Sequence, residues 1–336
     1  MSASTRALTY RDAISAALEE EMDLNPDVYL IGEDIAIGGG AFGVTKGFLD
    51  RYGPMRVVDA PIAESGFVGM SIGSAQMGLR PVIEMQFADF VSDAFKMLVH
   101  YAGGTYYRGG GPVPIVVRLP AGALKSAGPF HSCNPESWFY HTPGLKIVAP
   151  ASPYDAKGLL KAAVRDDNPV LFLEYKKLYN LPLSQYPEVL RMGAPEEDYT
   201  VPIGKARIVR EGEGVSLITH GTMVLEALRA AEQVERDGIE AEVIDLRSVI
   251  PFDRETVLGS VRRTGRAVIV HEDNKTGGVG SEWAAVLAEE AFDSLDAPLR
   301  RVAAPDAPIP YSPSLEDAFL PNAEKIADAL RAVVEF

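Results

Sequence analysis

The stretch DAPIAESGFVGMSIG, residues 59–73, places one carboxylate at the start of a segment rich in small residues. Its pattern predicts a strand end, a proline turn and then a helix that begins near Glu64. The three glycines inside this helix each cost roughly 0.8–1 kcal/mol relative to alanine. A sequence that accepts this cost usually lets another group approach the backbone closely.

Glu64 has two interpretations. A carboxylate in the first turn of a helix is stabilised by the helix dipole, and the isolated residue favours this capping role. In an apolar, water-poor pocket a Glu instead becomes an acid–base group that can protonate a ligand nitrogen. The neighbours favour this second role, because EMQFADF at residues 84–90 adds Phe87 and Phe90 for stacking on a flat ring. The apolar residues flanking Glu64 are Ile62, Phe67, Val68 and Met70.

A second motif, GGGAFG at residues 38–43, satisfies the pattern G-x-G-x-x-G, and Asp59 follows where a ribose-binding acid would lie. In a dinucleotide site, however, the first glycine follows its strand at once. Here GEDIAI intervenes and brings Glu33 and Asp34 towards the phosphates. We therefore interpret the motif as a flexible loop. A nicotinamide-dependent dehydrogenase remains an alternative, for which NADH titration is the test and no binding is expected.

Three further groups of residues are weaker candidates for a functional site. TGGVGSE, residues 276–282, opens a predicted helix and is either an anion site or a tight turn. The five histidines lie at no metal-site spacing, either with each other or with Cys133. His131 and Cys133 are a conceivable nucleophile pair. Residues two apart in a loop need not meet, however, and no oxyanion-binding group is evident.

Short β-branched runs alternate with helical patterns and predict an α/β fold with mainly parallel sheets. The first predicted helix is entered through Thr9, with Asp12 three residues later in a capping-box-like arrangement. In the first half, strands are predicted at 28–31, 56–59, 81–87, 114–119 and 169–175, and helices at 11–22, 92–103 and 155–166.

The second half repeats this alternation after a break in the pattern. Prolines and an acidic cluster at 181–204 predict a linker between two α/β domains in series, 1–180 and 205–336. Strands are predicted at 214–221, 241–246, 266–273 and 298–305, and helices at 222–238, 253–265, 281–295 and 322–336.

The composition of the chain limits the classes of partner and the cellular location that we expect. The chain of 336 residues is long enough for two domains, and its net charge of -15 disfavours nucleic acid as a partner. A single cysteine is typical of a reducing cytoplasm, and the N-terminus shows no signal-peptide pattern. No apolar run approaches the ~20 residues that span a bilayer. We therefore expect a cytoplasmic protein that binds neither nucleic acid nor membrane.

Taken together, three segments resemble the β-subunit of thiamine-diphosphate-dependent 2-oxoacid dehydrogenases, the decarboxylating first component of large multienzyme complexes. The segments are 59–90, 130–174 (FHSCNPESWFY through PVLFLE) and 242–253 (EVIDLRSVIPFD). The resemblance runs from about Thr9 to the C-terminus. It implies a transketolase-like pyrimidine-binding domain at 1–180 and a transketolase C-terminal-like domain at 205–336.

The resemblance also implies roles for individual residues. Glu64 matches the Glu that hydrogen-bonds N1′ of the aminopyrimidine ring of thiamine diphosphate. Phe90 matches the aromatic residue packed on that ring, while Ile62 and Gln86 match residues lining its pocket. His131 matches a His that assists acyl transfer to lipoamide.

A structural potassium ion is implied as well, held largely through carbonyl oxygens. The matching positions are Ile115, Ala163, Asp166 and Asn168, although a helix C-terminus before Pro169 explains the same letters. The chain lacks the GDG motif of a diphosphate and Mg²⁺ site. The resemblance therefore implies a separate α-subunit that holds both, in an α2β2 heterotetramer. It also implies docking of the second domain on a small basic domain of the lipoyl acyltransferase core.

Substrate choice is less sharply indicated. QFADF is closer to branched-chain members than to pyruvate members, so we expect a branched-chain 2-oxoacid, with pyruvate and acetoin as alternatives. Two departures from the family pattern lie around His131. GALKSAGPF lacks the His run of many branched-chain members, and HSCN replaces the more usual HSQS. The conformation of this loop and the preferred substrate are therefore left open. A non-catalytic assembly partner is a further alternative. The presence of Glu64, Phe90 and His131 argues against it.

Overall fold

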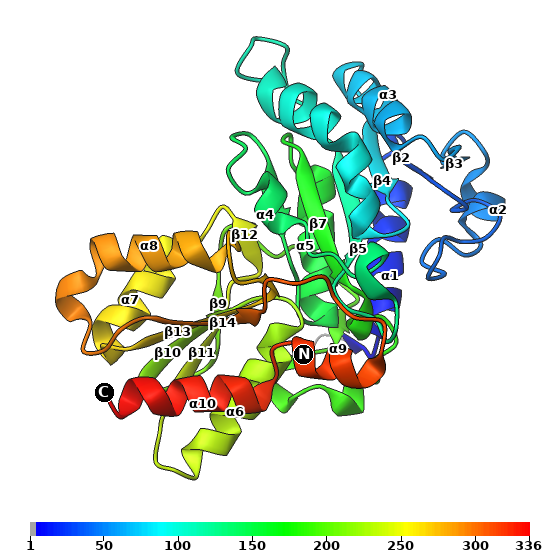
Figure 1. The fold of residues 1–336 in the computed structure, drawn as a ribbon. Helices are drawn as coiled ribbons and strands as arrows, with labels where there is room; N and C mark the ends of the chain where they lie inside the picture. Colours follow the sequence, from blue (N-terminus) through cyan, green and yellow to red (C-terminus); the bar gives the residue numbers. More distant parts are fainter. Residues whose placement is uncertain (1–4) are drawn as a thin grey trace.

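The computed structural model describes residues 5–336 and has two large sheets with helices on both faces (Figure 1). Within this described part, seven strands form the first sheet, and all neighbours are parallel except at β12. Their order is β12 (Ser248–Ile250), β6 (Lys146–Val148), β7 (Val170–Tyr175), β5 (Val116–Ala121), β4 (Arg80–Glu84), β2 (Val28–Gly32) and β3 (Val57–Asp59).

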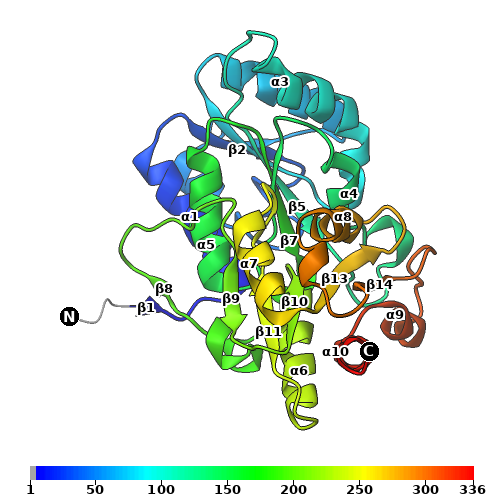
Figure 2. The same ribbon diagram turned by 90° about the vertical axis from the view of Figure 1, so that its left-hand side faces the viewer.

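Capped helices cover the first sheet. α1 (Tyr10–Leu24) begins where the Thr9 hydroxyl accepts a hydrogen bond from the Asp12 amide at 3.2 Å, which confirms the predicted cap. α5 (Pro153–Arg165) begins in the same way at Ser152 and packs beside α1 (Figure 2). α3 (Glu64–Gln76) packs on β4, and α2 (Phe48–Tyr52) and α4 (Glu136–Phe139) are short.

The segment predicted as one helix over 92–103 is irregular. A 3-10 turn, η1 (Ala88–Ala94), is followed by a π-helical turn, η2 (Met97–Gly103). Both pack against α3, and the Ser65 hydroxyl donates a hydrogen bond to the Asp93 carbonyl. The start of α3 is therefore fixed to the segment that follows β4.

The second sheet, again within the described part, has five strands. Their order is β14 (Arg300–Ala304), β13 (Ala267–Asn274), β10 (Val215–Thr219), β11 (Ala241–Asp245) and β9 (Arg207–Arg210), with only β9 antiparallel. Figure 1 shows α7 (Arg254–Thr264) and α8 (Gly280–Glu290) on one face and α6 (Met223–Glu235) and α10 (Ala323–Val334) on the other. α9 (Pro313–Phe319) lies near the first domain.

The mainly parallel two-sheet α/β fold is confirmed, but three strands of these two sheets were not predicted. β6, β9 and β12 are only three or four residues long, too short to show a clear period. β12 also pairs antiparallel with β6, about 100 positions earlier in the chain. A strand from the second half therefore completes the first sheet, so the chain is not divided into two separate sheets at the linker.

The segment 181–204 packs against α5. It contains two 3-10 turns, η5 (Leu183–Gln185) and η6 (Glu188–Leu190), and β8 (Ala194–Pro195), which pairs with β1 (Thr5–Arg6). Tyr186 is fully buried, and Asp198 forms ion pairs with Lys161 and Arg165.

Among residues 5–336, no helix is both long and apolar enough to cross a membrane.

Candidate active site

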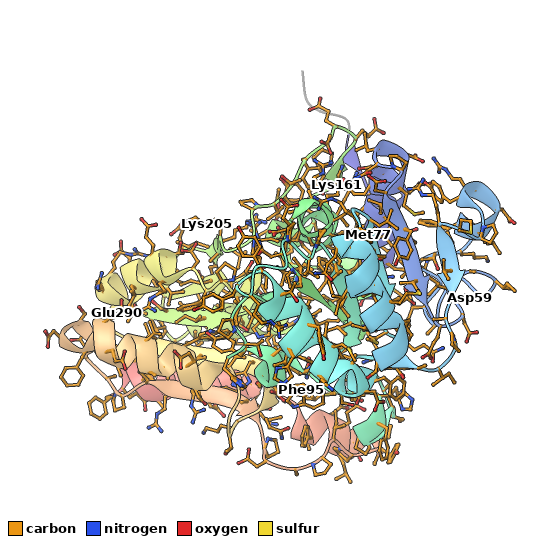
Figure 3. The ribbon with its side chains drawn as sticks, turned by 90° about the horizontal axis from the view of Figure 1, so that it is seen from above. Asp59, Met77, Phe95, Lys161, Lys205 and Glu290 are labelled. Atoms are coloured by element: carbon orange, nitrogen blue, oxygen red, sulfur yellow. The ribbon has the colours of Figure 1, made fainter. Side chains whose placement is uncertain are left out.

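The predicted chemistry lies where parallel strands of the first sheet end. Ligands commonly bind outside the carboxyl ends of such strands. β2 ends before Glu33 and Asp34, β3 ends at Asp59, and β4 ends two residues before Gln86. The Asp59 carboxylate accepts the Ala36 amide at 2.7 Å, and Gln86 donates to Asp34 at 3.2 Å. Hydrogen bonds thus join three strand ends into one wall. Figure 3 labels Asp59, at the end of β3, on the half of the molecule that holds the first sheet.

Glu64 is the first residue of α3 and is only 8% exposed. A second buried carboxyl, Glu33, lies near enough for the charge of Glu64 to act on it. Burial raises the pKa of Glu33, and the charges of Glu64 and Asp34 raise it further. Glu33 Oε1 has no hydrogen-bond partner among the described residues. Two neighbouring buried acids, one with an unpaired oxygen, fit a ligand that supplies a nitrogen donor.

Aromatic rings form the next part of the site. The ring centroids of Phe87 and His131 are 4.5 Å apart, and Phe90 lies 5.7 Å from His131 and 6.0 Å from Phe87, all edge-to-face. Phe42, from the GGGAFG loop, is 5.5 Å from Phe87. The structure thus brings Phe90 and His131 together, although they are 41 positions apart in the chain.

A fully buried ion-pair network supports these strand ends. Arg118 on β5 donates to both oxygens of Glu174 on β7, at 2.7 and 2.9 Å, and also to Glu84 on β4. Burial opposes the charge of Arg118, but Glu174 and Glu84 outweigh this effect and raise its pKa. The Tyr179 hydroxyl completes the network with a 2.6 Å bond to Glu174. Three neighbouring strands are therefore fixed immediately beneath the site.

Sequence reasoning missed two charged residues here. Asp89 accepts hydrogen bonds from the backbone amides of Ser132 and Cys133, directly after His131. Lys176, directly after β7, is buried with its ammonium 5.6 Å from the centroid of Phe87. Burial lowers the pKa of Lys176 to about 8, against the opposing charge of Asp89. Asp89 lies within the QFADF motif, and a lysine directly after a fully buried strand is itself an unusual signal.

The remaining predicted pocket residues differ in exposure. Ile62, which precedes α3, is 85% exposed, and Met70 on α3 is also exposed. Gln86 and Phe90 are half-buried, whereas Phe67 and Val68 point into the core and cannot line a surface pocket. The water-poor environment expected for Glu64 is therefore only partly supplied by its apolar sequence neighbours.

The two glycine motifs have structural explanations. In GGGAFG, Gly39, Gly40 and Gly43 have positive φ, and a Cβ on Gly40 would collide with the Glu84 carboxylate. This loop does not lead directly into a helix, because α2 begins only at Phe48. In TGGVGSE, a side chain on Gly278 or Gly280 would collide with His271. The first motif is a loop packed against the buried network, and the second a tight turn.

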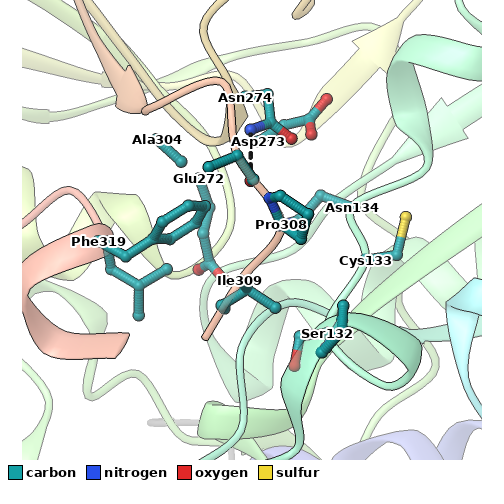
Figure 4. Close-up of a pocket in the computed structure, with 13 residues that line it drawn as sticks. Ser132, Cys133, Asn134, Glu272, Asp273, Asn274, Ala304, Pro308, Ile309 and Phe319 are labelled. Carbon is teal, nitrogen blue, oxygen red and sulfur yellow. Dashed lines mark hydrogen bonds between the residues drawn. The ribbon is translucent and has the colours of Figure 1, made fainter. Parts of the chain in front are cut away.

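The loop after β5 carries His131 and is supported by the second domain. Glu272 on β13 accepts the Ala123 amide at 2.6 Å, and Glu316 on α9 accepts the Ser126 amide at 3.0 Å. Between the loop and that domain lies a cavity of about 150 Å³ lined by Ser132, Cys133, Asn134 and Glu272–Asn274 (Figure 4). Burial and nearby carboxylates raise the pKa of the Cys133 thiol, so it is not an activated nucleophile.

The predicted potassium positions lie in one hydrogen-bonded corner. The Ile115 carbonyl accepts the Val170 amide at 2.9 Å, and the Ala163 carbonyl accepts the Asp166 amide at 3.2 Å. Asp166 also accepts bonds from Asn168 and from the Lys146 ammonium, and these bonds outweigh burial and lower its pKa. Arg80 donates to the Asp166 carbonyl at 3.1 Å. The carbonyl oxygens of Ile115 and Ala163 each keep a lone pair that a cation could use. The cationic side chains of Lys146 and Arg80, however, already lie at this corner.

Fold and site together define a class of protein. The family model for the transketolase pyrimidine binding domain matches residues 6–182, and that for the transketolase C-terminal domain matches residues 204–326. A solved structure described as a split gene transketolase, inactive beta4 tetramer, superposes with a TM-score of 0.79 at 23% identity, covering 98% of this chain and 99% of that one. The chain is therefore a transketolase-type α/β protein.

Sequence relatives narrow the class. The 2-oxoisovalerate dehydrogenase subunit beta of Bacillus subtilis is 45% identical over 98% of this chain and 99% of its own length. The pyruvate dehydrogenase E1 component subunit beta of Staphylococcus epidermidis is 43% identical over 98% of this chain and 99% of its own. The chain belongs to the β-subunits of the thiamine-diphosphate-dependent 2-oxoacid dehydrogenases.

Proposed function

We propose that this chain supplies the aminopyrimidine half of a thiamine diphosphate site for the decarboxylation of a branched-chain 2-oxoacid and acyl transfer to a lipoyl group. The observation that carries the proposal is the pair of buried acids Glu64 and Glu33 at the carboxyl edge of the sheet that also carries the rings of Phe87, Phe90 and His131. The hydrogen bond from Gln86 to Asp34 joins the two parts of this edge. A carboxyl, an aromatic surface and an imidazole are the groups that this cofactor and reaction require.

Each residue then has a separate task. When bound, thiamine diphosphate supplies the electron sink for decarboxylation. Glu64 holds a proton at its carboxyl for the ring nitrogen of the aminopyrimidine, and Glu33 adds a second carboxyl beside it. Phe90 packs on the ring, and Ile62 and Gln86 line its edge. His131 delivers a proton during acyl transfer, since an imidazole can both donate and accept near neutral pH.

Substrate preference is tested by comparing kcat/KM between the candidate substrates. The branched-chain relative and the pyruvate relative are 45% and 43% identical, so identity does not separate them. The protein should be co-expressed with its α-subunit and assayed with thiamine diphosphate and Mg²⁺ on 2-oxoisovalerate, pyruvate and acetoin. We expect the highest kcat/KM for 2-oxoisovalerate. A higher value for pyruvate would overturn the branched-chain assignment while preserving the reaction class.

We propose that an α-subunit holds Mg²⁺ and the diphosphate in an α2β2 heterotetramer. The apolar side chains of Ile62 before α3, Met70 on α3 and Met77 directly after it are exposed and support a partner at this part of the surface, because exposed apolar clusters commonly mark interfaces. Light scattering of the co-purified protein gives the mass that tests this assembly.

Docking to a basic domain of the lipoyl acyltransferase core is proposed from the net charge of -15.

A structural K⁺ at Ile115, Ala163, Asp166 and Asn168 is a further proposal. Its support is that these residues share one corner and present carbonyl oxygens suited to a hard cation. Thermal unfolding in potassium chloride and in choline chloride at equal ionic strength tests it. A higher Tm in potassium is expected. Equal values would mean that Lys146 and Arg80 neutralise this corner without a metal.

The domain bounds and the location also remain proposals. We propose a pyrimidine-binding domain at 1–180, a linker at 181–204 and a C-terminal domain at 205–336. The matched ranges 6–182 and 204–326 support this division. The proposed location is the cytoplasm, which cell fractionation would test.

A further inference from the structure

We propose that Asp89 is a positioning residue that holds the His131 loop in register with the ring platform of Phe87 and Phe90. This inference rests on the proposed function, because it assigns Asp89 to the acyl-transfer half of that reaction. Nothing in the sequence patterns distinguishes Asp89 from a solvated acid in a turn. Its contacts across 43 and 44 positions of the chain do so.

The contacts of Asp89 are directed at one short segment. Oδ1 accepts the amides of Ser132 at 3.3 Å and Cys133 at 3.2 Å, and Oδ2 accepts the Cys133 amide at 3.3 Å. These are the two amides that follow His131, and Asp89 itself precedes Phe90. One carboxylate thus connects the residue next to the ring platform with the residues next to the imidazole. Hydrogen bonds to an ionised acceptor are stronger than neutral ones.

The charge around Asp89 favours this arrangement. The nearby buried Lys176 has a pKa lowered to about 8 by burial, and Asp89 is the first of the charges that oppose this shift. Lys176 also lies over the Phe87 ring and donates to the Pro120 carbonyl at 3.2 Å. Asp89 therefore has a fixed cation beside it as well as two amide donors. Both interactions favour one position of the carboxylate.

The bonds from Glu272 and Glu316 hold the loop earlier, at Ala123 and Ser126, and the side of residues 132–134 that faces the second domain has fewer contacts. The Cys133 carbonyl accepts the Gly122 amide at 3.1 Å, but that side otherwise borders the cavity of about 150 Å³. Among the described residues, Ser132 Oγ and Asn134 Oδ1 have no hydrogen-bond partner there. The loop can therefore move towards the cavity when its bonds to Asp89 are lost. His131 would move with it, away from Phe87.

The step affected is the reduction of the lipoyl disulfide. In that step the S–S bond breaks, one sulfur takes the acyl group, and the other takes a proton as two electrons arrive from the decarboxylated substrate. We place the proton donation on His131. A displacement of about 1 Å in a reacting group can cost about 100-fold in rate. Decarboxylation followed by oxidation with a small dye needs no such proton.

The test compares two partial reactions of the assembled enzyme. The variants are Asp89→Asn, Asp89→Ala, His131→Asn and the double variant Asp89→Asn with His131→Asn. The control is Asp93→Asn, which removes the same charge from an exposed residue of the same turn. One assay follows 2-oxoacid-dependent reduction of dichlorophenolindophenol, and the other follows reductive acylation of a lipoylated domain.

We expect Asp89→Ala to slow lipoyl acylation at least about 10-fold and dye reduction less than about twofold. Asp89→Asn should be intermediate, since its amide oxygen still accepts one bond. In the His131→Asn background, Asp89→Asn should have no further effect, because both changes remove one function. Equal losses in both assays, or independent effects in the double variant, would overturn the proposal.

Hydrogen exchange gives a readout that does not depend on activity. In Asp89→Ala, a peptide covering residues 131–134 should exchange faster at the Ser132 and Cys133 amides, whereas Asp93→Asn should match wild type. Unchanged exchange in Asp89→Ala would overturn the positioning role whatever the kinetics show. Absence of 2-oxoacid-dependent dye reduction in wild type would instead contradict the proposed function, so the two failures are distinguishable.

Discussion

At the scale of the residue, the site depends on carboxylates that differ in their surroundings. Glu33 and Glu64 are neighbouring acids with little solvent, whereas Glu84 and Glu174 are paired with Arg118. Asp89 uses its oxygens for backbone amides. The same side-chain chemistry therefore provides a buried pair of acids, a rigid support and a loop anchor, and each role is set by the partners within reach.

Replacing Glu64 with Gln separates a chemical role from a capping role. We expect turnover with thiamine diphosphate to fall by at least about 100-fold, because a general acid–base group typically contributes this much. Assembly with the α-subunit should be unchanged in light scattering. The control is Glu282→Gln, an exposed first-turn carboxylate on α8 with the same favourable place on a helix dipole. Similar activity in the two variants would support capping alone.

Arg118→Met tests the buried support. The change leaves Glu84 and Glu174 buried without their cation, so the free energy of unfolding should fall by roughly 3–5 kcal/mol. Urea unfolding of the assembled protein measures it. Arg51→Met, which breaks an exposed pairing with Glu19 and Asp23, should cost at most about 1 kcal/mol. A comparable small effect at both positions would contradict the structural role of Arg118.

At the scale of the element, the end of β11 is tied to α5. Arg247 pairs with Asp155, the residue at the start of α5, at 2.6 Å, and its backbone amide donates to Asp245 at 2.9 Å. Burial, and then the charge of Asp155, raise the pKa of Asp245 to about 7. A helix of the first half and a strand of the second are therefore joined by acids that share one arginine.

Asp245→Asn should change stability in a pH-dependent way. The folded protein holds the Asp245 proton more tightly than the unfolded chain, so this carboxyl favours folding most below its ordinary pKa of 3.8. That advantage is lost as the pH rises through about 7. Asn cannot ionise but still accepts the Arg247 amide. The variant should match wild type near pH 4 and be more stable at pH 8, by up to about 4 kcal/mol.

Unfolding at both pH values checks this expectation. An exposed control, Asp50→Asn, should show no such dependence on pH. A gain of equal size at pH 4 and pH 8 would show that packing, rather than ionisation of Asp245, controls the effect.

Elements with many periodic residues could be predicted from sequence, and short or distant pairings could not. α1 and its Thr9 cap follow from local chemistry, as do the long hydrophobic strands β5 and β7. β12 depends on β6, and the contacts of Asp89 depend on a loop that is 43 positions away. Local patterns do not encode these pairings. Motifs and a family resemblance singled out Glu64, Phe90 and His131, and their roles remain predictions. The structure adds that the rings of Phe90 and His131 lie 5.7 Å apart, a contact that no local pattern shows.

At the scale of the whole molecule, the two halves share structure rather than simply adjoining. β12 extends the first sheet, and Glu272 and Glu316 of the second half accept the amides of Ala123 and Ser126 in the loop that carries His131. The second domain therefore supports the geometry of the first. Changes far from Glu64 in sequence can reach the site through these contacts.

A truncated chain tests this dependence. Residues 1–204 alone lack β12 and the Arg247 contact to Asp155, so β6 becomes an unpaired sheet edge. We expect this fragment to be poorly soluble, and a chain ending after residue 253 to be more soluble, as measured by the soluble fraction after expression. Equal solubility of the two would show that β12 adds little to the first sheet.

The position of β12 also constrains how the chain is made. Synthesis proceeds from the N-terminus at about 5–20 residues per second, and domains generally fold as they emerge. β6, however, gains its second neighbour in the first sheet only when Ser248–Ile250 has been made. During that interval β6 offers free hydrogen-bonding groups to any other nascent chain nearby. A cell that produces this protein in quantity therefore benefits from a chaperone that shields the growing polypeptide until three quarters of it has left the ribosome.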